Sequence, residues 1–212
     1  MAENNTGHVV EEGPVTLEIT DELIAERRSG APGELPEDMP HWMAFLISRI
    51  DWFSLWTGRI VCWLTVPIFV SMAYEIIVRY AFTAPTMWAY DISRMLYGAL
   101  FMLGAGYGLY RGIHIRADFI YRHWSPRTQG IVDGTLYILF YFPGLIVFAW
   151  MATEFAYESW IIFERGMDTA WMPYVFPIKT ALPVGIVMLL IQGVSELLKC
   201  LYAATKGRWP TS

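Results

Sequence analysis

Long apolar runs separated by short charged segments dominate the chain from residue 60 onward. The runs occupy about 60–80, 88–110, 134–153 and 175–198. A hydrocarbon core about 30 Å thick needs roughly 20 helical residues at 1.5 Å per residue, so each run is long enough to cross it once. The pattern predicts an all-α membrane protein with four transmembrane helices in one domain over residues 60–201.

A different periodicity precedes the first span, over residues 41–59. Apolar side chains recur there at spacings of three and four residues, with charged side chains between them. The apolar set is Trp42, Phe45, Leu46, Ile50, Phe53 and Trp56. Such a stripe is typical of an amphipathic helix that lies among lipid headgroups or leads into a span. We therefore expect an interfacial helix over 41–59.

Composition agrees with a membrane protein, and the charge distribution distinguishes the beginning of the chain from the rest. Hydrophobic residues make up 55% of the 212 positions and charged residues only 17%, below the share of about a quarter in soluble domains. The formal net charge of −5 comes from the beginning of the chain, because residues 1–40 hold ten acids and only two bases. We expect residues 1–40 to form an acidic, disordered tail and 202–212 to form a short C-terminal tail.

Basic residues in short segments predict the orientation of the spans. The segment between the second and third spans carries four arginines, and Lys199, Lys206 and Arg208 follow the fourth span, whereas acids prevail between the third and fourth. Both termini are therefore expected in the cytoplasm. Three tryptophans, Trp88, Trp160 and Trp171, fall where anchors at the outer membrane interface are expected.

Four ionisable residues fall close to that outer boundary. Glu75 and Arg79 are four residues apart in the first span, and Asp91 and Arg94 are three apart in the second. Side chains at these spacings share a helix face and can pair, which favours a structural role over an ion path. We also expect Arg79 and Asp91 to be partners across the hairpin. No span carries an ionisable group at mid-depth.

Glycines and prolines inside the spans indicate helix contacts and kinks. Gly104 and Gly108 are four residues apart and present a small-residue face that another helix can approach closely. Pro143 and Gly144 lie in the middle of the third span and predict a kink. The four positions are candidates for a packing surface toward another subunit.

His114, Arg116 and Asp118 follow the second span in one short segment. They are equally compatible with a headgroup-binding cluster, a helix-capping arrangement or a contact with a partner. The histidines all lie outside the spans, which argues against axial haem ligation within the membrane. The sequence shows no nucleophile–base pair, metal-ligand cluster, cofactor site or nucleic-acid patch, so we predict a protein that is not an enzyme.

Several short motifs, in this order and position, resemble a known family. They are Arg79-Tyr80-Ala81-Phe82, then Pro85, Trp88 and Asp91, then Gly104 to Arg111 and His114-Ile115-Arg116-Ala117-Asp118, then Glu158-Ser159-Trp160, and Pro177-Ile178-Lys179 with Leu182-Pro183-Val184-Gly185. The chain resembles the small permease subunit of tripartite ATP-independent periplasmic (TRAP) transporters, the DctQ-like family. Many members carry two acids after the tryptophan, whereas this chain has Asp91 alone.

The resemblance implies a subunit of a three-part importer in the bacterial inner membrane. A periplasmic binding protein would deliver an organic acid to a large permease subunit, a sodium gradient would drive uptake, and the small subunit would scaffold the large one. Its partners would be these two proteins and membrane lipids. Two alternatives remain: a self-sufficient small carrier or channel, and a membrane adaptor that acts through its acidic tail.

Overall fold

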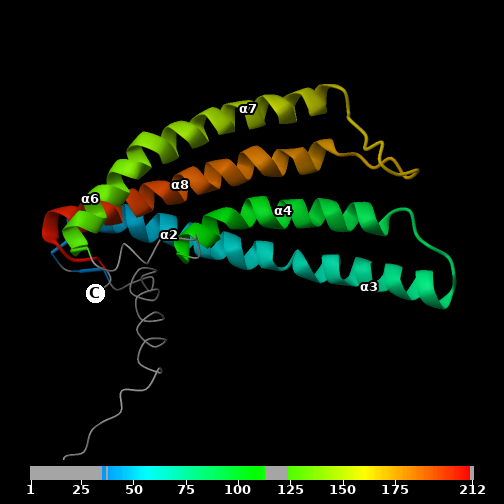
Figure 1. The fold of residues 1–212 in the computed structure, drawn as a ribbon, viewed down its shortest axis with the longest axis horizontal. Helices are drawn as coiled ribbons and strands as arrows, with labels where there is room; N and C mark the ends of the chain where they lie inside the picture. The colour runs from blue at the N-terminus through cyan, green and yellow to red at the C-terminus, as the bar shows by residue number, and fades with distance from the viewer. Residues whose placement is uncertain (1–34, 37, 113–123, 211–212) are drawn as a thin grey trace, which may run out of the picture.

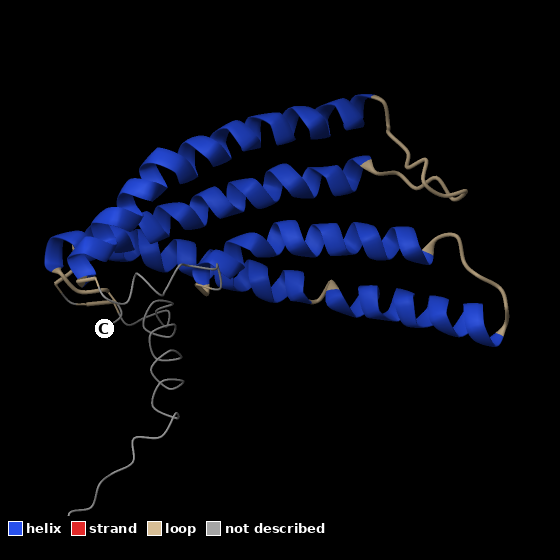
Figure 2. Cartoon of the chain, viewed as in Figure 1, coloured by secondary structure: helices blue, strands red, loops and turns tan. Residues whose placement is uncertain are grey.

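The computed structural model describes residues 35–36, 38–112 and 124–210. His114, Arg116 and Asp118, and most of the predicted tail, lie outside these residues. The described elements are α2 (His41–Cys62), α3 (Thr65–Ala81), α4 (Ala89–Tyr110), α6 (Pro126–Leu136), the π-helical turn η1 (Tyr137–Tyr141), α7 (Phe142–Ile161) and α8 (Phe176–Lys206). Figure 2 shows the described residues as helices and loops. Strand-like pairing among them is limited to one bridge, between Arg165 and Tyr174. The predicted all-α class is confirmed.

Four helices lie side by side in the order α7, α8, α4 and α3, and α8 contacts the largest number of other elements (Figure 1). The segments 82–88 and 162–175 both lie at one end of this bundle, which we call the turn end. The start of α2 and the end of α8 lie together at the opposite end, which we call the terminal end. The close packing of α8 on α4 depends on Gly185, because a Cβ atom there would be 2.4 Å from the carbonyl oxygen of Met102.

Three helical segments of the described chain are long and apolar enough to cross a membrane. They are His41–Ala81, which joins α2 and α3, Pro126–Ile161, which joins α6, η1 and α7, and Phe176–Lys206. The predicted second span coincides with α4, but α4 does not belong to this set. Its polar first turns, which carry Asp91 and Arg94, lower its average hydropathy.

The α2–α3 arm breaks at Trp63 and Leu64. Pro67 explains the position of the break. Proline has no N–H to donate to the carbonyl of residue 63, and its ring collides with that carbonyl in a regular helix. The backbone instead makes two tight turns, in which Trp63 N–H donates to Ile60 O and Leu64 N–H donates to Val61 O, and α3 starts at Thr65.

The kink predicted at Pro143 takes the form of a π-helical turn. Pro143 removes the hydrogen bond to residue 139, and the five residues before Phe142 form η1. The helical path over Pro126–Ile161 stays continuous and curves along its length (Figure 1).

The described residues of the two predicted tails contact each other. Met39, placed in the N-terminal tail, is 4% exposed and packs with Met43, Ile47 and Tyr202. Its neighbour Asp38 accepts a hydrogen bond of 2.8 Å from the Tyr202 hydroxyl and pairs with Arg208 at 2.7 Å.

These contacts with Tyr202 and Arg208 lower the pKa of the Asp38 carboxyl. At the other end of the chain, α8 continues to Lys206 and stops at Gly207, whose φ of 71° suits glycine. The sequence could not show that the two chain ends meet, because their contact joins residues more than 160 positions apart.

Candidate functional site

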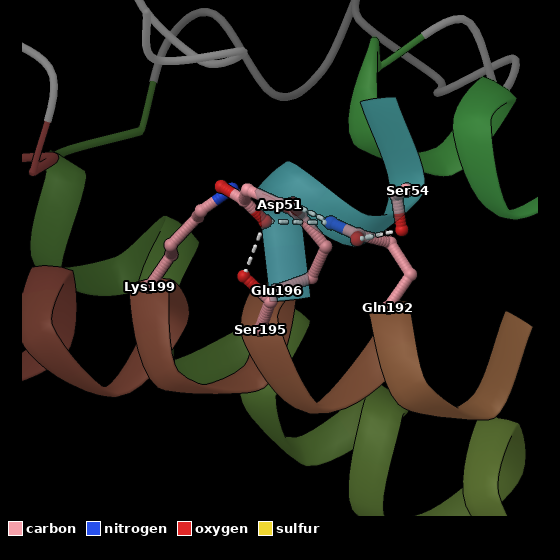
Figure 3. A network of polar contacts seen from close by, with 6 residues as sticks. All are labelled: Asp51, Ser54, Gln192, Ser195, Glu196 and Lys199. Atoms are coloured by element: carbon pink, nitrogen blue, oxygen red, sulfur yellow. Dashed lines mark hydrogen bonds and ion pairs between the residues drawn. The ribbon is translucent and has the colours of Figure 1, made fainter. Parts of the chain in front are cut away.

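Six polar side chains form one network where α2 crosses α8 (Figure 3). Asp51 Oδ1 accepts hydrogen bonds from Ser195 Oγ at 2.7 Å and from Gln192 Nε2 at 3.0 Å. Lys199 Nζ lies 2.8 Å from Asp51 Oδ2 and 2.9 Å from Glu196 Oε1. Ser54 Oγ completes the network by donating to Gln192 Oε1 at 2.6 Å.

The network is buried and charged, with two carboxylates around one ammonium group. The Lys199 side chain is 2% exposed and that of Asp51 is 8% exposed. A buried charge costs several kcal/mol unless a partner and further hydrogen bonds compensate it. Here both charge pairing and hydrogen bonding depend on α2 lying at one position along α8. The network can therefore fix the register of the α2 arm on the bundle.

The six residues were not among the predicted site residues, and only Lys199 entered the earlier argument, as one of the basic residues after the fourth span. The predicted apolar stripe points outward, since Trp42, Phe45 and Trp56 are 58%, 59% and 46% exposed. The face turned to the bundle consists of Met43, Ile47, Asp51, Ser54, Gly58 and Val61. A usable signal was present in α8, where Gln192, Ser195, Glu196 and Lys199 recur at helical spacing within an apolar run. In a membrane the solvent is lipid, so the mixed face is the inner one.

A second group of charges lies at the turn end. Arg79 Nε donates to Glu75 Oε1 at 2.8 Å, as the four-residue spacing predicts. The other Glu75 oxygen accepts from the backbone N–H of Thr86 at 2.9 Å and from the Thr86 hydroxyl. Glu75 therefore fastens the segment 82–88 to the last turns of α3.

Asp91 and Arg94 fasten a different segment. Asp91 is fully buried and accepts a hydrogen bond from the Thr169 hydroxyl, while Arg94 lies 2.7 Å from Asp168 and 3.6 Å from Asp91. The described residues show no ion pair between Arg79 and Asp91. Our expectation that these two residues are partners is therefore replaced by two separate clusters, one on each connecting segment.

The segment 162–175 folds back on itself and borders a cleft of about 570 Å³ next to α4 and α8. Two backbone hydrogen bonds hold the fold, from Gly166 N–H to Pro173 O at 2.8 Å and from Val175 N–H to Glu164 O at 3.0 Å. Lys179 on α8 donates to the Glu164 carboxylate, and this hydrogen bond lowers the pKa of Glu164. The charged groups that line the cleft are thus largely paired with one another.

The predicted packing glycines Gly104 and Gly144 have open space around them within the chain. A Cβ atom added at Gly104 would meet only Val61, at 4.0 Å, and one added at Gly144 would meet nothing within 4 Å. Pro143 is exposed beside Gly144. The close approaches within the described chain instead use glycines that sequence analysis did not select, among them Gly58, Gly130, Gly185 and Gly193. A role for Gly104 and Gly108 toward another subunit stays a prediction.

The three predicted anchor tryptophans lie at the turn end, at or beside helix ends. Trp88 precedes α4 and stacks on Tyr74 with ring centroids 5.6 Å apart. Trp160, near the end of α7, donates its indole N–H to Thr180 Oγ1 at 2.8 Å. Trp171 is 45% exposed in the connecting segment. Their assignment to a membrane interface stays a prediction.

These features define a multi-pass helical membrane protein whose buried charges pair within the chain. Comparison with protein families gives a match over residues 68–202 to the family described as tripartite ATP-independent periplasmic transporters, DctQ component. The chain belongs to this family, which confirms the resemblance seen in its motifs. It is a membrane component of a TRAP transporter and not an enzyme. Comparisons with curated proteins and with solved structures give no match.

Membership of the family also implies the other two parts of a TRAP complex in general terms, a large membrane component and a binding component.

Proposed function

We propose that this chain is the scaffolding subunit of a sodium-driven importer for an organic acid. It holds the large permease subunit in the bacterial inner membrane, and a periplasmic binding protein delivers the substrate to the complex. Residues 41–59 act as an interfacial helix in this proposal. The chain crosses the membrane four times.

The exposed surface of α7 is the observation that carries the scaffolding role. None of the residues in the most apolar window of Pro126–Ile161 is buried in the chain by itself. The buried residues of α7 are limited to Ala152, Ala156 and Ser159, which leaves a long apolar face for lipid and for another subunit. Val147, Trp150 and Met151 are among the side chains on this face that are more than 60% exposed.

α4 supplies the fourth crossing in this proposal. Its 22 residues reach about 33 Å, which matches the hydrocarbon thickness. It lies between α3 and α8, and the charged groups of its first turns are paired with Thr169 and Asp168. Four crossings agree with the position of both described chain ends at the terminal end, which we assign to the cytoplasm on the basis of Lys206, Arg208 and the arginines of the segment 111–127.

Reconstituted vesicles test the proposal directly. We expect sodium-dependent uptake of organic acids by vesicles that contain this chain, its large subunit and the binding protein, and none by vesicles that contain this chain alone. Uptake by the chain alone would support the self-sufficient carrier. Unchanged uptake by a complex without the chain would contradict a scaffolding role.

The pairing of the described charges favours the scaffold over the self-sufficient carrier. A carrier needs ionisable groups at mid-depth that exchange partners during transport. In the part of the chain that the structure describes, Asp51, Lys199, Glu75 and Arg94 each have a partner within the chain. Removal of residues 1–34 distinguishes the scaffold from the remaining alternative, a membrane adaptor that acts through its acidic tail. The adaptor would lose its function without these residues, and the scaffold would keep it.

A further inference from the structure

The outward face of α2 carries arginines and exposed tryptophans over the same turns whose inward face carries the buried network. Arg49 lies over the ring of Phe45, with 5.3 Å from Cζ to the ring centroid, and Arg59 lies over Trp56 at 5.6 Å. Both arginines are exposed. We propose that this face binds the phosphate headgroups of anionic phospholipids. We define the surface by Arg49, Arg59, Trp52, Trp56 and Trp63.

Charge complementarity is the first argument. Among the described residues, neither Arg49 nor Arg59 has a carboxylate within ion-pair distance, and their recorded contacts are with aromatic rings. Arg94 and Lys199, by contrast, each lie within 3 Å of a carboxylate. A guanidinium group without an acidic partner on an apolar helix face is suited to a phosphate, which it binds through two parallel N–H donors.

Depth along the helices is the second argument. Counted from the turn end, about 20 residues from Ala81 reach Cys62, which is the length that crosses the hydrocarbon core. The remainder of α2 lies beyond that length. Arg49 and Arg59 both lie on this remainder, so the count places their guanidinium groups on the headgroup side of the hydrocarbon core.

The aromatic side chains are the third argument. Trp52, Trp56 and Trp63 are 54%, 46% and 74% exposed, and the rings of Trp52 and Trp56 are 6.2 Å apart. Tryptophan favours the boundary between acyl chains and headgroups, where its ring is apolar and its N–H stays solvated. This surface would hold the α2 arm against the membrane while the network holds it against α8. It rests on the interfacial position proposed for residues 41–59 and does not depend on the scaffolding role.

Native mass spectrometry of the purified full chain in detergent tests the proposal, with titrations of phosphatidylglycerol and of phosphatidylcholine. One basic side chain near an anionic surface is worth about a fivefold change in affinity. We therefore expect the double variant R49Q/R59Q to bind phosphatidylglycerol roughly 30-fold more weakly than wild type, with binding of phosphatidylcholine unchanged. The variant R49K/R59K should keep most of the affinity.

The matched control is R127Q/K206Q, which removes the same two charges from exposed positions at the terminal end. It should retain affinity for phosphatidylglycerol. The proposal is overturned if wild type binds both lipids equally, if R49Q/R59Q binds phosphatidylglycerol like wild type, or if the control loses as much affinity as R49Q/R59Q. Because the four side chains are exposed, the melting temperatures of all variants should stay close to that of wild type.

Discussion

Replacement of Lys199 by methionine should strongly destabilise the chain. The substitution keeps the length and the apolar stem of the side chain but removes the only ammonium group of the buried network shown in Figure 3. Asp51 and Glu196, 6% and 8% exposed, then lose their contacts at 2.8 and 2.9 Å with the lysine nitrogen. Removal of one partner from a buried ion pair costs about 3–5 kcal/mol.

The expected cost corresponds to a large change in thermal stability. For a chain of 150–250 residues, 1 kcal/mol changes the melting temperature by about 2–4 °C. Lys199→Met should therefore lower the melting temperature by roughly 6–20 °C. Thermal unfolding of the detergent-solubilised protein, followed by size-exclusion chromatography of the fraction that stays folded, measures this change.

Two comparison variants sharpen the experiment. Lys206 lies seven residues further along α8, is 49% exposed in its side chain and is 3.7 Å from Asp38, so Lys206→Met should cost less than about 1 kcal/mol. Asp51→Asn leaves Lys199 and Glu196 as a balanced pair and should cost less than Lys199→Met. A melting temperature for Lys199→Met equal to that of Lys206→Met would refute the view that the network holds α2 on α8.

Three further predictions concern packing, pH and assembly. Gly185→Ala should destabilise the chain by about 1–3 kcal/mol through the clash with Met102, whereas Gly98→Ala, with nothing within 4 Å of the added Cβ, should be neutral or stabilising in thermal unfolding. Since the folded-state pKa of Glu164 is lowered, its contribution to stability is complete above its unfolded pKa of about 4.3 and is lost as the pH falls through the folded pKa. The melting temperature of wild type should therefore exceed that of Glu164→Gln at pH 6 and approach it at low pH; a constant difference would contradict the pairing with Lys179. The variant G104L/G108L should reduce copurification with the large subunit, and equal loss with Gly98→Leu would contradict a specific packing face.

Local spacing in the sequence is enough to predict one ion pair and one helix irregularity. The pair Glu75–Arg79 follows from a four-residue spacing on one helix, and the irregular turn before Pro143 follows from the missing N–H of proline. The class of the protein follows from apolar runs and composition alone. These features depend on residues that are neighbours in the chain, so helix geometry is sufficient to predict them.

Contacts between distant segments depended on the tertiary structure. The polar spacing in α8 marks a face that needs partners, but it does not name Asp51, which is more than 140 residues from Ser195 and Lys199. Nor does local spacing indicate that Asp91 accepts a hydrogen bond from Thr169. The apolar stripe of α2 points away from the rest of the chain, because an apolar stripe on a helix points inward in water and outward in lipid. Which face of α2 is buried is decided by the groups that α8 and α4 present to it. Helix periodicity identifies the two faces, and only the packed bundle determines which of them is inside.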